Sequence, residues 1–134
     1  MPLIDSDMIL AYIKKDDRHQ ESAEIIFGKI IAGELEVYIS SSMFVEIAFV
    51  LKRNNQLDLL SDVYKLIYKM PNISIIPISE NIIEDAYKHM MKDIGILDSI
   101  QAATALRYDK KIISTDHIFD KIKGLIRIKP EEIQ

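Results

Sequence analysis

Apolar residues recur along this chain in two alternating patterns: short β-favouring runs and longer stretches with the spacing of an amphipathic helix. The short runs predict strands at residues 2–5, 36–39, 73–78, 111–114 and 125–128. The longer stretches predict helices at residues 8–13, 19–31, 43–51, 57–70, 79–93 and 97–108, and a short helix at 116–122. Serines stand where helix N-caps are expected, at Ser6, in the cluster 40–42 and at Ser79.

The order of these elements predicts the fold class. Strands that alternate with helices favour a parallel sheet, because parallel neighbours need crossover connections of this length. We therefore expect an α/β protein, a three-layer α/β/α sandwich with a central, mostly parallel sheet. The helix at 57–70 should pair with the preceding helix as a hairpin. No repeat or linker divides the 134 residues, so one domain over 1–134 is expected.

Composition narrows the possible chemistry and location. The chain has no cysteine, which excludes disulfides and thiolate metal sites and fits a reducing cytosol. The three histidines, His19, His89 and His117, lack the spacing of a zinc-binding pair. The N-terminus has no secretion-signal pattern, and no apolar run approaches the roughly 20 residues that span a bilayer. A soluble, cytoplasmic protein without a membrane partner is therefore expected.

The formal net charge of -4 argues against a nucleic-acid partner, but the charges are unevenly distributed. Seven basic residues lie between positions 107 and 129, against three acidic ones. Two interpretations stay open for this segment: a solvated surface, or a stripe that binds nucleic acid.

Three aspartates lie at predicted junctions between strands and helices. Asp5 ends the first strand, Asp116 follows the strand at 111–114, and Asp98 opens the helix at 97–108. Each could simply cap a helix, although Ser6 and Asp7 are also available to cap the first one. Ligands gather outside the carboxyl ends of parallel strands, so one shared site explains Asp5 and Asp116 better than two coincidences.

Glu46 is the most unusual acidic residue in the chain. All the residues from 43 to 51 except Glu46 are apolar, and a helix that is apolar all round should be buried. An unpaired ionised carboxylate in such a place would be very costly. Glu46 should therefore coordinate a cation, unless it pairs with an arginine or lies in a narrow exposed seam.

Two further acids are weaker candidates. Asp7 lies two residues after Asp5 and should point elsewhere. Asp120 lies one helical turn after Asp116 and could reach the rim of a site, although a surface pair with Lys123 is the simpler expectation.

A set of gathered carboxylates selects Mg²⁺ or Mn²⁺, since these hard cations prefer carboxylate and water oxygens. Bound ions offset a repulsion of roughly 4 kcal/mol between two carboxylates about 4 Å apart, at an effective dielectric constant of about 20. They also activate water for attack on phosphorus. Asp5, Glu46, Asp98 and Asp116 are therefore predicted to serve metal-assisted phosphodiester hydrolysis.

The chain closely resembles the PIN domain family, and within it the VapC-type ribonuclease toxins. The resemblance rests on Asp5-Ser6, the lone Glu46, and the stretches 97–105 (LDSIQAATA) and 114–119 (STDHIF), and it covers essentially the whole length. It implies that Asp5, Glu46, Asp98 and Asp116 form the family's acidic quartet, and that Ser6 and Thr115 are supporting hydroxyls. It also implies a dimeric, Mg²⁺- or Mn²⁺-dependent RNA nuclease inhibited by a cognate antitoxin. The chain departs from the family pattern at Asp7, where many members carry asparagine or another small polar residue.

Two other functions fit parts of the sequence. Residues 4–7 (IDSD) resemble the nucleophile loop of haloacid-dehalogenase-like phosphatases, in which Asp5 would attack phosphorus. That scheme leaves Glu46 unexplained. A catalytically idle module that binds a partner through the helices around Phe44 and up to Met70 is the other alternative, and the intact carboxylates argue against it.

Overall fold

A computed structural model describes residues 1–134 and has a five-stranded sheet at its centre. The strands are β1 (Leu3–Ile4), β2 (Val37–Ser40), β3 (Ile73–Ile76), β4 (Lys111–Ile113) and β5 (Ile126–Ile128). Their spatial order is β3-β2-β1-β4-β5, and every neighbouring pair is parallel. The sheet is thus entirely parallel, and its first strand lies in the middle.

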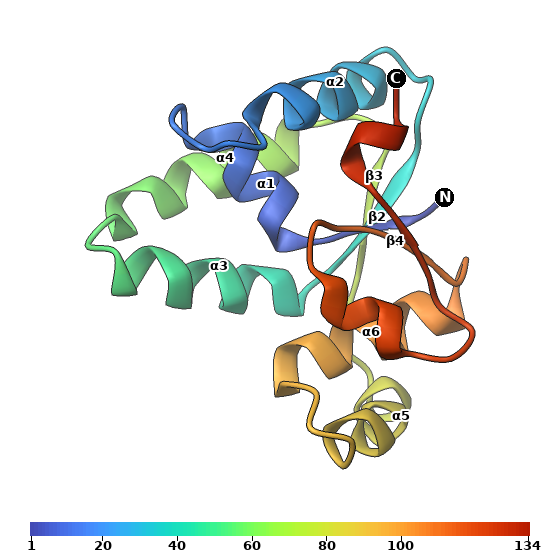
Figure 1. Cartoon of the computed structure of the whole chain (residues 1–134). Coiled ribbons are helices and arrows are strands. Elements are labelled where there is room, and N and C mark those ends of the chain that lie inside the picture. The colour runs from blue at the N-terminus through green and yellow to red at the C-terminus, as the bar shows by residue number, and fades with distance from the viewer.

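Six α-helices flank the sheet (Figure 1). They are α1 (Ser6–Ile13), α2 (Gln20–Ile31), α3 (Ser42–Arg53), α4 (Leu60–Lys69), α5 (Glu80–Met90) and α6 (Ile96–Arg107). Three short 3-10 helices are η1 (Leu57–Leu59), η2 (His117–Lys121) and η3 (Pro130–Glu132). The predicted helices at 57–70 and 116–122 were therefore partly wrong, since the first begins as a 3-10 turn and the second is 3-10 throughout.

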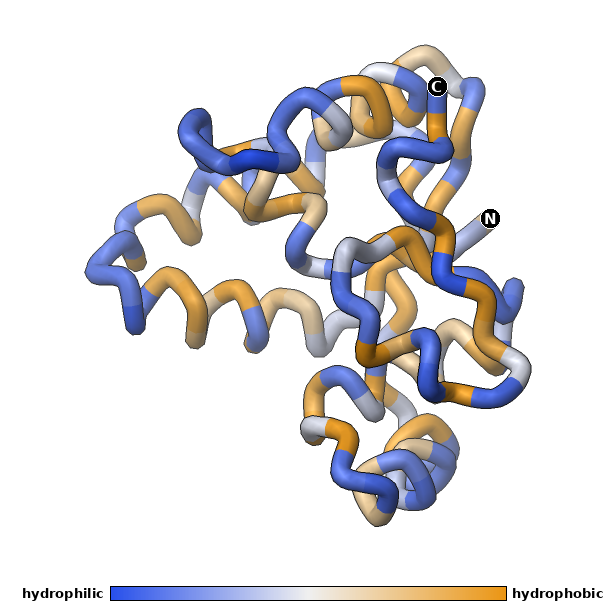
Figure 2. Tube along the Cα trace, viewed as in Figure 1, coloured by the Kyte–Doolittle hydropathy of each residue, from blue (hydrophilic) through white to orange (hydrophobic).

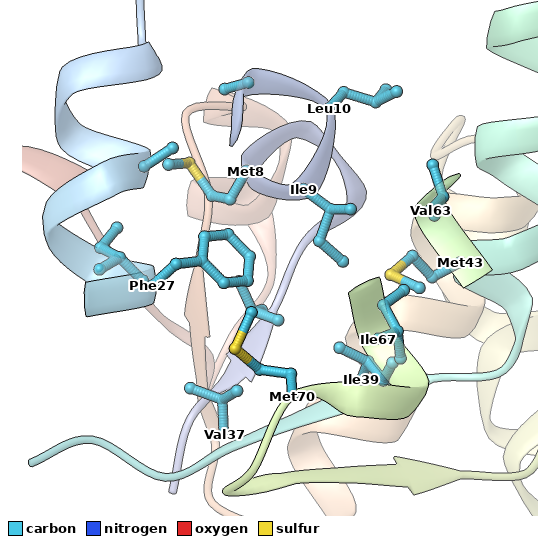
Figure 3. Close-up of a cluster of buried hydrophobic side chains, with 14 of the residues drawn as sticks. Met8, Ile9, Leu10, Phe27, Val37, Ile39, Met43, Val63, Ile67 and Met70 are labelled. Carbon is cyan, nitrogen blue, oxygen red and sulfur yellow. The ribbon is translucent and has the colours of Figure 1, made fainter. Parts of the chain in front are cut away.

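Each face of the sheet buries its own set of side chains. The first face points Ile4, Val37 and Ile39 into a core completed by α1, α2, α3 and α4, as Figure 3 shows around Phe27 and Met43. The opposite face packs Leu3, Ile76 and Ile112 against α5, α6 and η2. Alternate residues of each strand serve opposite faces, as the pleat requires. This arrangement is the predicted three-layer α/β/α sandwich.

Helix α3 is not buried all round, contrary to the expectation from its composition. Met43, Ile47 and Leu51 are fully buried, but Val45 and Phe49 keep 47% and 62% of their surface exposed. The apolar residues of this helix exceed what the core can cover. The expected hairpin with α4 is present, because the ring of Phe44 contacts those of Tyr64 and Tyr68.

The hydropathy of the chain follows the same layers. Hydrophilic residues gather in the connections, most visibly in the α1–α2 loop and the turn between α3 and α4 (Figure 2). None of the helices combines the length and the apolar character needed to cross a bilayer.

Candidate active site

Asp5 directly follows the central strand and lies at the carboxyl end of the sheet. It is the N-cap of α1, with Oδ1 accepting a hydrogen bond from the Ser6 amide at 2.7 Å. Ser6 was expected to cap this helix, but it is instead the first helical residue, because the extended backbone of Asp5 places the carboxylate over the helix start. Oδ1 also accepts from Gln101 Nε2 at 2.8 Å, and Oδ2 accepts from the Ser114 hydroxyl at 2.7 Å.

A second carboxylate, that of Asp7 in the first turn of α1, is hydrogen-bonded to a residue just after the end of β4. Asp7 Oδ2 accepts hydrogen bonds from the Thr115 amide, at 2.9 Å, and from the Thr115 hydroxyl. Strands β1 and β4 are parallel neighbours, so the residues that follow them meet at one edge of the sheet. Asp7 therefore faces the same edge as Asp5, although the sequence had suggested that it points elsewhere.

Helices α3 and α6 bring two further acids to this edge. Glu46 is half-buried, and its Oε2 atom is enclosed without a hydrogen-bond partner. Asp98 is also half-buried and lies in the first turn of α6. Helix α6 starts at Ile96, and its N-cap is Gly95, so Asp98 does not cap it. A hollow of about 830 Å³ opens beside both acids, lined by Glu46, Phe49, Val50, Lys52, Arg53, Gly95, Ile96, Leu97 and Asp98.

Asp116 occupies the exposed rim of the site. Its Oδ1 caps η2 by accepting from the Ile118 amide at 2.9 Å, and its own amide donates to the Ser114 hydroxyl at 3.0 Å. Only one carboxylate oxygen is used in this cap. The second is available to a ligand.

Mutual repulsion links the five acids Asp5, Asp7, Glu46, Asp98 and Asp116. Burial is the largest cause that raises the pKa of Asp5, Asp7, Glu46 and Asp98. Neighbouring carboxylates raise these pKa values further: Asp7 and Glu46 act on Asp5, Asp116 acts on Asp7 and Asp98, and Asp98 acts on Glu46. Acids from four separate chain segments therefore share one electrostatic site.

The chemistry of this site suits a hard divalent cation. No three acidic or histidine side chains converge closely enough to hold a metal ion as they stand. Three oxygens around the site, Asp7 Oδ1, Glu46 Oε2 and Gln101 Oε1, are nevertheless buried without hydrogen-bond partners. Buried polar atoms normally have partners, so these oxygens are free to face a cation or its water. Carboxylate and amide oxygens are donors that Mg²⁺ and Mn²⁺ prefer.

Asp120 lies outside the acidic site. Its Oδ1 accepts from Arg127 Nε at 2.9 Å, and its Oδ2 lies 3.2 Å from His117 Nδ1. The expected pair with Lys123 is absent, because Arg127 on the neighbouring β5 reaches Asp120 instead. Arg107 is likewise engaged, by Asp85 at 2.6 Å. Two of the seven basic residues between 107 and 129 are thus structural.

Sequence reasoning missed Gln101 and Ser114 as parts of the site. Gln101 is fully buried in α6, next to alanines in the sequence. Ser114 is fully buried directly after the end of β4. Both hold Asp5 in place. A glutamine amid small apolar residues was the available signal for Gln101. Ser114 carried no such signal, because a serine that follows a strand is commonplace in turns.

The fold and the gathered carboxylates define an α/β protein with an acidic site at the carboxyl ends of its strands. The sequence matches the PIN domain over residues 3–125, and the chain belongs to the PIN domain family. Among curated proteins, no sequence match was found.

Solved structures of other proteins share the fold. VapBC2 from Rickettsia felis, bound to a promoter DNA fragment, has a TM-score of 0.70 at 16% identity, over 94% of this chain and 96% of that chain. A toxin–antitoxin complex from Klebsiella pneumoniae has a TM-score of 0.65 at 20% identity, over 97% and 98%. VapC20 of Mycobacterium tuberculosis, a toxin that cleaves the sarcin-ricin loop, has a TM-score of 0.68 at 13% identity, over 86% and 89%.

Proposed function

We propose that this protein is a metal-dependent endoribonuclease and the toxin of a type II toxin–antitoxin pair. The observation that carries the proposal is the group of five carboxylates at the sheet edge, with buried oxygens that lack partners, in a chain of the PIN domain family. The solved structures with this fold add support, because two contain toxin–antitoxin pairs and a third is a loop-cleaving toxin.

Asp5, Glu46, Asp98 and Asp116 would hold Mg²⁺ or Mn²⁺, directly or through water. When bound, the ion lowers the pKa of a coordinated water and neutralises charge on the phosphate. Ser114 and Gln101 fix the Asp5 carboxylate through their hydrogen bonds. The free Oε2 of Glu46 can accept a hydrogen bond from the attacking water and orient it. Thr115 holds Asp7 beside these groups, with Oδ1 of Asp7 left free.

The decisive experiment is cleavage of total RNA by the purified protein with Mn²⁺, followed by mapping of the new ends. We expect new RNA ends with the wild type, and none in EDTA. Asp5→Asn and Asp98→Asn should each lower the cleavage rate about 100-fold or more, since each removes a charged ligand. Asp58→Asn makes the same charge change at an exposed position on η1, away from the site, and should cleave like the wild type. Equal loss in all three variants would refute the site assignment.

Two partner proposals accompany the ribonuclease. The protein should form a homodimer, which light scattering on the purified chain tests directly. It should also be bound and inhibited by a cognate antitoxin in the cytoplasm, as the paired chains in the related toxin–antitoxin structures suggest. Addition of the candidate antitoxin should then stop RNA cleavage at equimolar concentration.

The phosphatase alternative fits the structure poorly. That scheme uses Asp5 as nucleophile and Asp7 as acid/base, and it gives no role to Glu46 and Asp98, which share the same electrostatic site. A trapped phosphoaspartate at Asp5 would support the phosphatase. An idle binding module would show no Mn²⁺-dependent cleavage.

A further inference from the structure

A second hollow, which we call the basic pocket, is lined in part by Thr115, the residue that holds Asp7 in the acidic site. It measures about 390 Å³, and no apolar side chain other than that of a proline lines it. Three separate chain segments form it: the α1–α2 loop, the junction of β4 with η2, and the segment from β5 into η3. Its lining residues are Arg18, His19, Thr115, His117, Arg127, Lys129, Pro130 and Glu131.

The basic pocket holds positive charge that the protein does not neutralise. Arg18 and Lys129 are not buried and form no ion pair. Arg18 uses only Nε, which donates to His19 Nε2 at 3.1 Å, so its two terminal amino groups are free. Arg127 is different, because its side chain is 5% exposed and bound to Asp120. Glu131 is the single acid in the lining. In a chain with a net charge of -4, this local excess of cations favours an anionic ligand.

The position of the basic pocket ties it to the acidic site. Thr115 lines the pocket and donates to Asp7 with both its amide and its hydroxyl. His117, on the same wall, directly follows Asp116. Glu46 and Asp98 line the larger hollow instead. One hollow therefore borders Glu46 and Asp98, and the other borders Thr115, which holds Asp7.

We propose that the basic pocket binds a backbone phosphate of the RNA strand, next to the phosphodiester that is cleaved. This inference rests on the proposed ribonuclease function. The guanidinium of Arg18 suits a phosphate because its amino groups can donate two parallel hydrogen bonds, and Lys129 adds a mobile point charge. A phosphate contact fixes the register of a strand without reading its sequence. The pocket thus supplies the attraction for RNA that the acidic site lacks, and it positions the neighbouring bond over the carboxylates.

The test compares Arg18→Ala/Lys129→Ala with Lys121→Ala/Lys123→Ala. The second pair makes the same charge change at exposed lysines outside the pocket. Binding of a fluorescein-labelled single-stranded RNA is measured by anisotropy in EDTA, over a series of salt concentrations. The pocket pair should weaken binding about tenfold and lower the salt slope by about 0.7 for each phosphate that the protein no longer neutralises. The control pair should bind like the wild type, and both should melt at the wild-type temperature.

Cleavage kinetics with Mn²⁺ provide the second measurement. Removal of an interaction made equally to substrate and transition state raises KM and leaves kcat unchanged, which is the expected result for the pocket pair alone. Equal weakening in both pairs, no weakening in either, or a wild type that binds no RNA would overturn the proposal. RNA binding that depends on the pocket without any cleavage would support the pocket and refute the ribonuclease.

Discussion

Asp5 combines a structural role and a proposed chemical role in one side chain. Its carboxylate caps α1 and accepts hydrogen bonds from Gln101 and Ser114, so its two oxygens are fixed before any ligand arrives. Burial and neighbouring acids raise its pKa, which means that the fold resists ionisation at this position. The hydrogen bonds from Ser114 and from the Ser6 amide oppose that rise. The contacts that hold the carboxylate in place therefore also stabilise its charge.

Asp116 offers a clean separation of structure from function. Asparagine at this position keeps an oxygen to accept from the Ile118 amide, whereas alanine removes the cap. In EDTA, Asp116→Asn should therefore unfold at the wild-type temperature, and Asp116→Ala should lose about 1 kcal/mol. Both variants should lose Mn²⁺-dependent RNA cleavage. Thermal unfolding and the RNA assay measure the two effects, and a much lower melting temperature for Asp116→Asn would make this residue chiefly structural.

The pH dependence of stability follows from the raised pKa values of Asp5, Asp7, Glu46 and Asp98. Above the ordinary carboxyl value of about 4, the native state binds more protons than the unfolded state. The free energy of unfolding should therefore fall as pH rises from about 4 through the native pKa values in EDTA. Urea unfolding at a series of pH values measures this slope.

Asp98→Asn should flatten this pH dependence, because it removes one of the raised carboxyls and relieves its neighbours. Asp120→Asn provides the control, since its partner Arg127 lowers the pKa of Asp120. Removal of the Asp120 carboxyl should not flatten the fall of the unfolding free energy with rising pH. An Asp98→Asn profile that parallels the wild type would contradict the electrostatic account.

The sequence indicated part of the site at this scale. Asp5, Asp98 and Asp116 were found because strand ends and helix starts can be read from hydrophobic periodicity. Glu46 was found by its apolar neighbours, although α3 is half exposed and Val45 and Phe49 face away from the core. Gln101 and Ser114 depend on the β1–β4 pairing and on the rotation of α6, which no local pattern contains. The chemical roles of the four acids stay a prediction.

At the scale of elements, Arg127 fastens η2 to the sheet. Its guanidinium donates to both oxygens of Asp120, at 2.9 and 3.2 Å, and to the Ser114 carbonyl at 3.0 Å. One side chain on β5 thus joins the end of β4 to the 3-10 helix that Asp116 caps. The position of the rim carboxylate depends on this connection.

Arg127→Lys should loosen this connection, because an ammonium cannot span Asp120 and the Ser114 carbonyl as the planar guanidinium does. We expect a loss of about 1.5–3 kcal/mol in the free energy of unfolding, the usual value of hydrogen bonds to a charged group. Amides of η2 should exchange faster with deuterium. Lys121→Ala, on the same 3-10 helix but without these contacts, is the control. Unchanged exchange in Arg127→Lys would show that η2 is held by Phe119 and Ile122 alone.

The elements themselves were largely predictable, whereas their neighbours in space were not. Each strand and α-helix has a local hydrophobic period, and every one was placed within a few residues. The order β3-β2-β1-β4-β5 depends on where each crossover returns to the sheet. Helix η2 is also bound by Arg127 from β5, a contact that no local pattern contains.

At the scale of the whole molecule, the acidic site is a source of instability that the proposed cation would offset. A ligand that binds only the native state adds about 2.7 kcal/mol at 100 times its dissociation constant. Saturating Mn²⁺ should therefore raise the melting temperature of the wild type by on the order of 5–10 °C. Asp5→Asn should show a much smaller shift, and Asp58→Asn, at an exposed position on η1, the full one. Equal shifts of the melting temperature in the three proteins, measured by calorimetry, would refute the assigned metal site.

The central place of β1 in the sheet also sets the moment at which activity can begin during synthesis. Asp5 leaves the ribosome early, but its partners Gln101 and Ser114 lie more than ninety residues later. Strand β4 must then pair beside β1, and β5 beside β4, before Asp116 and its rim are fixed. A nascent chain therefore carries no assembled site until nearly all of its residues have emerged.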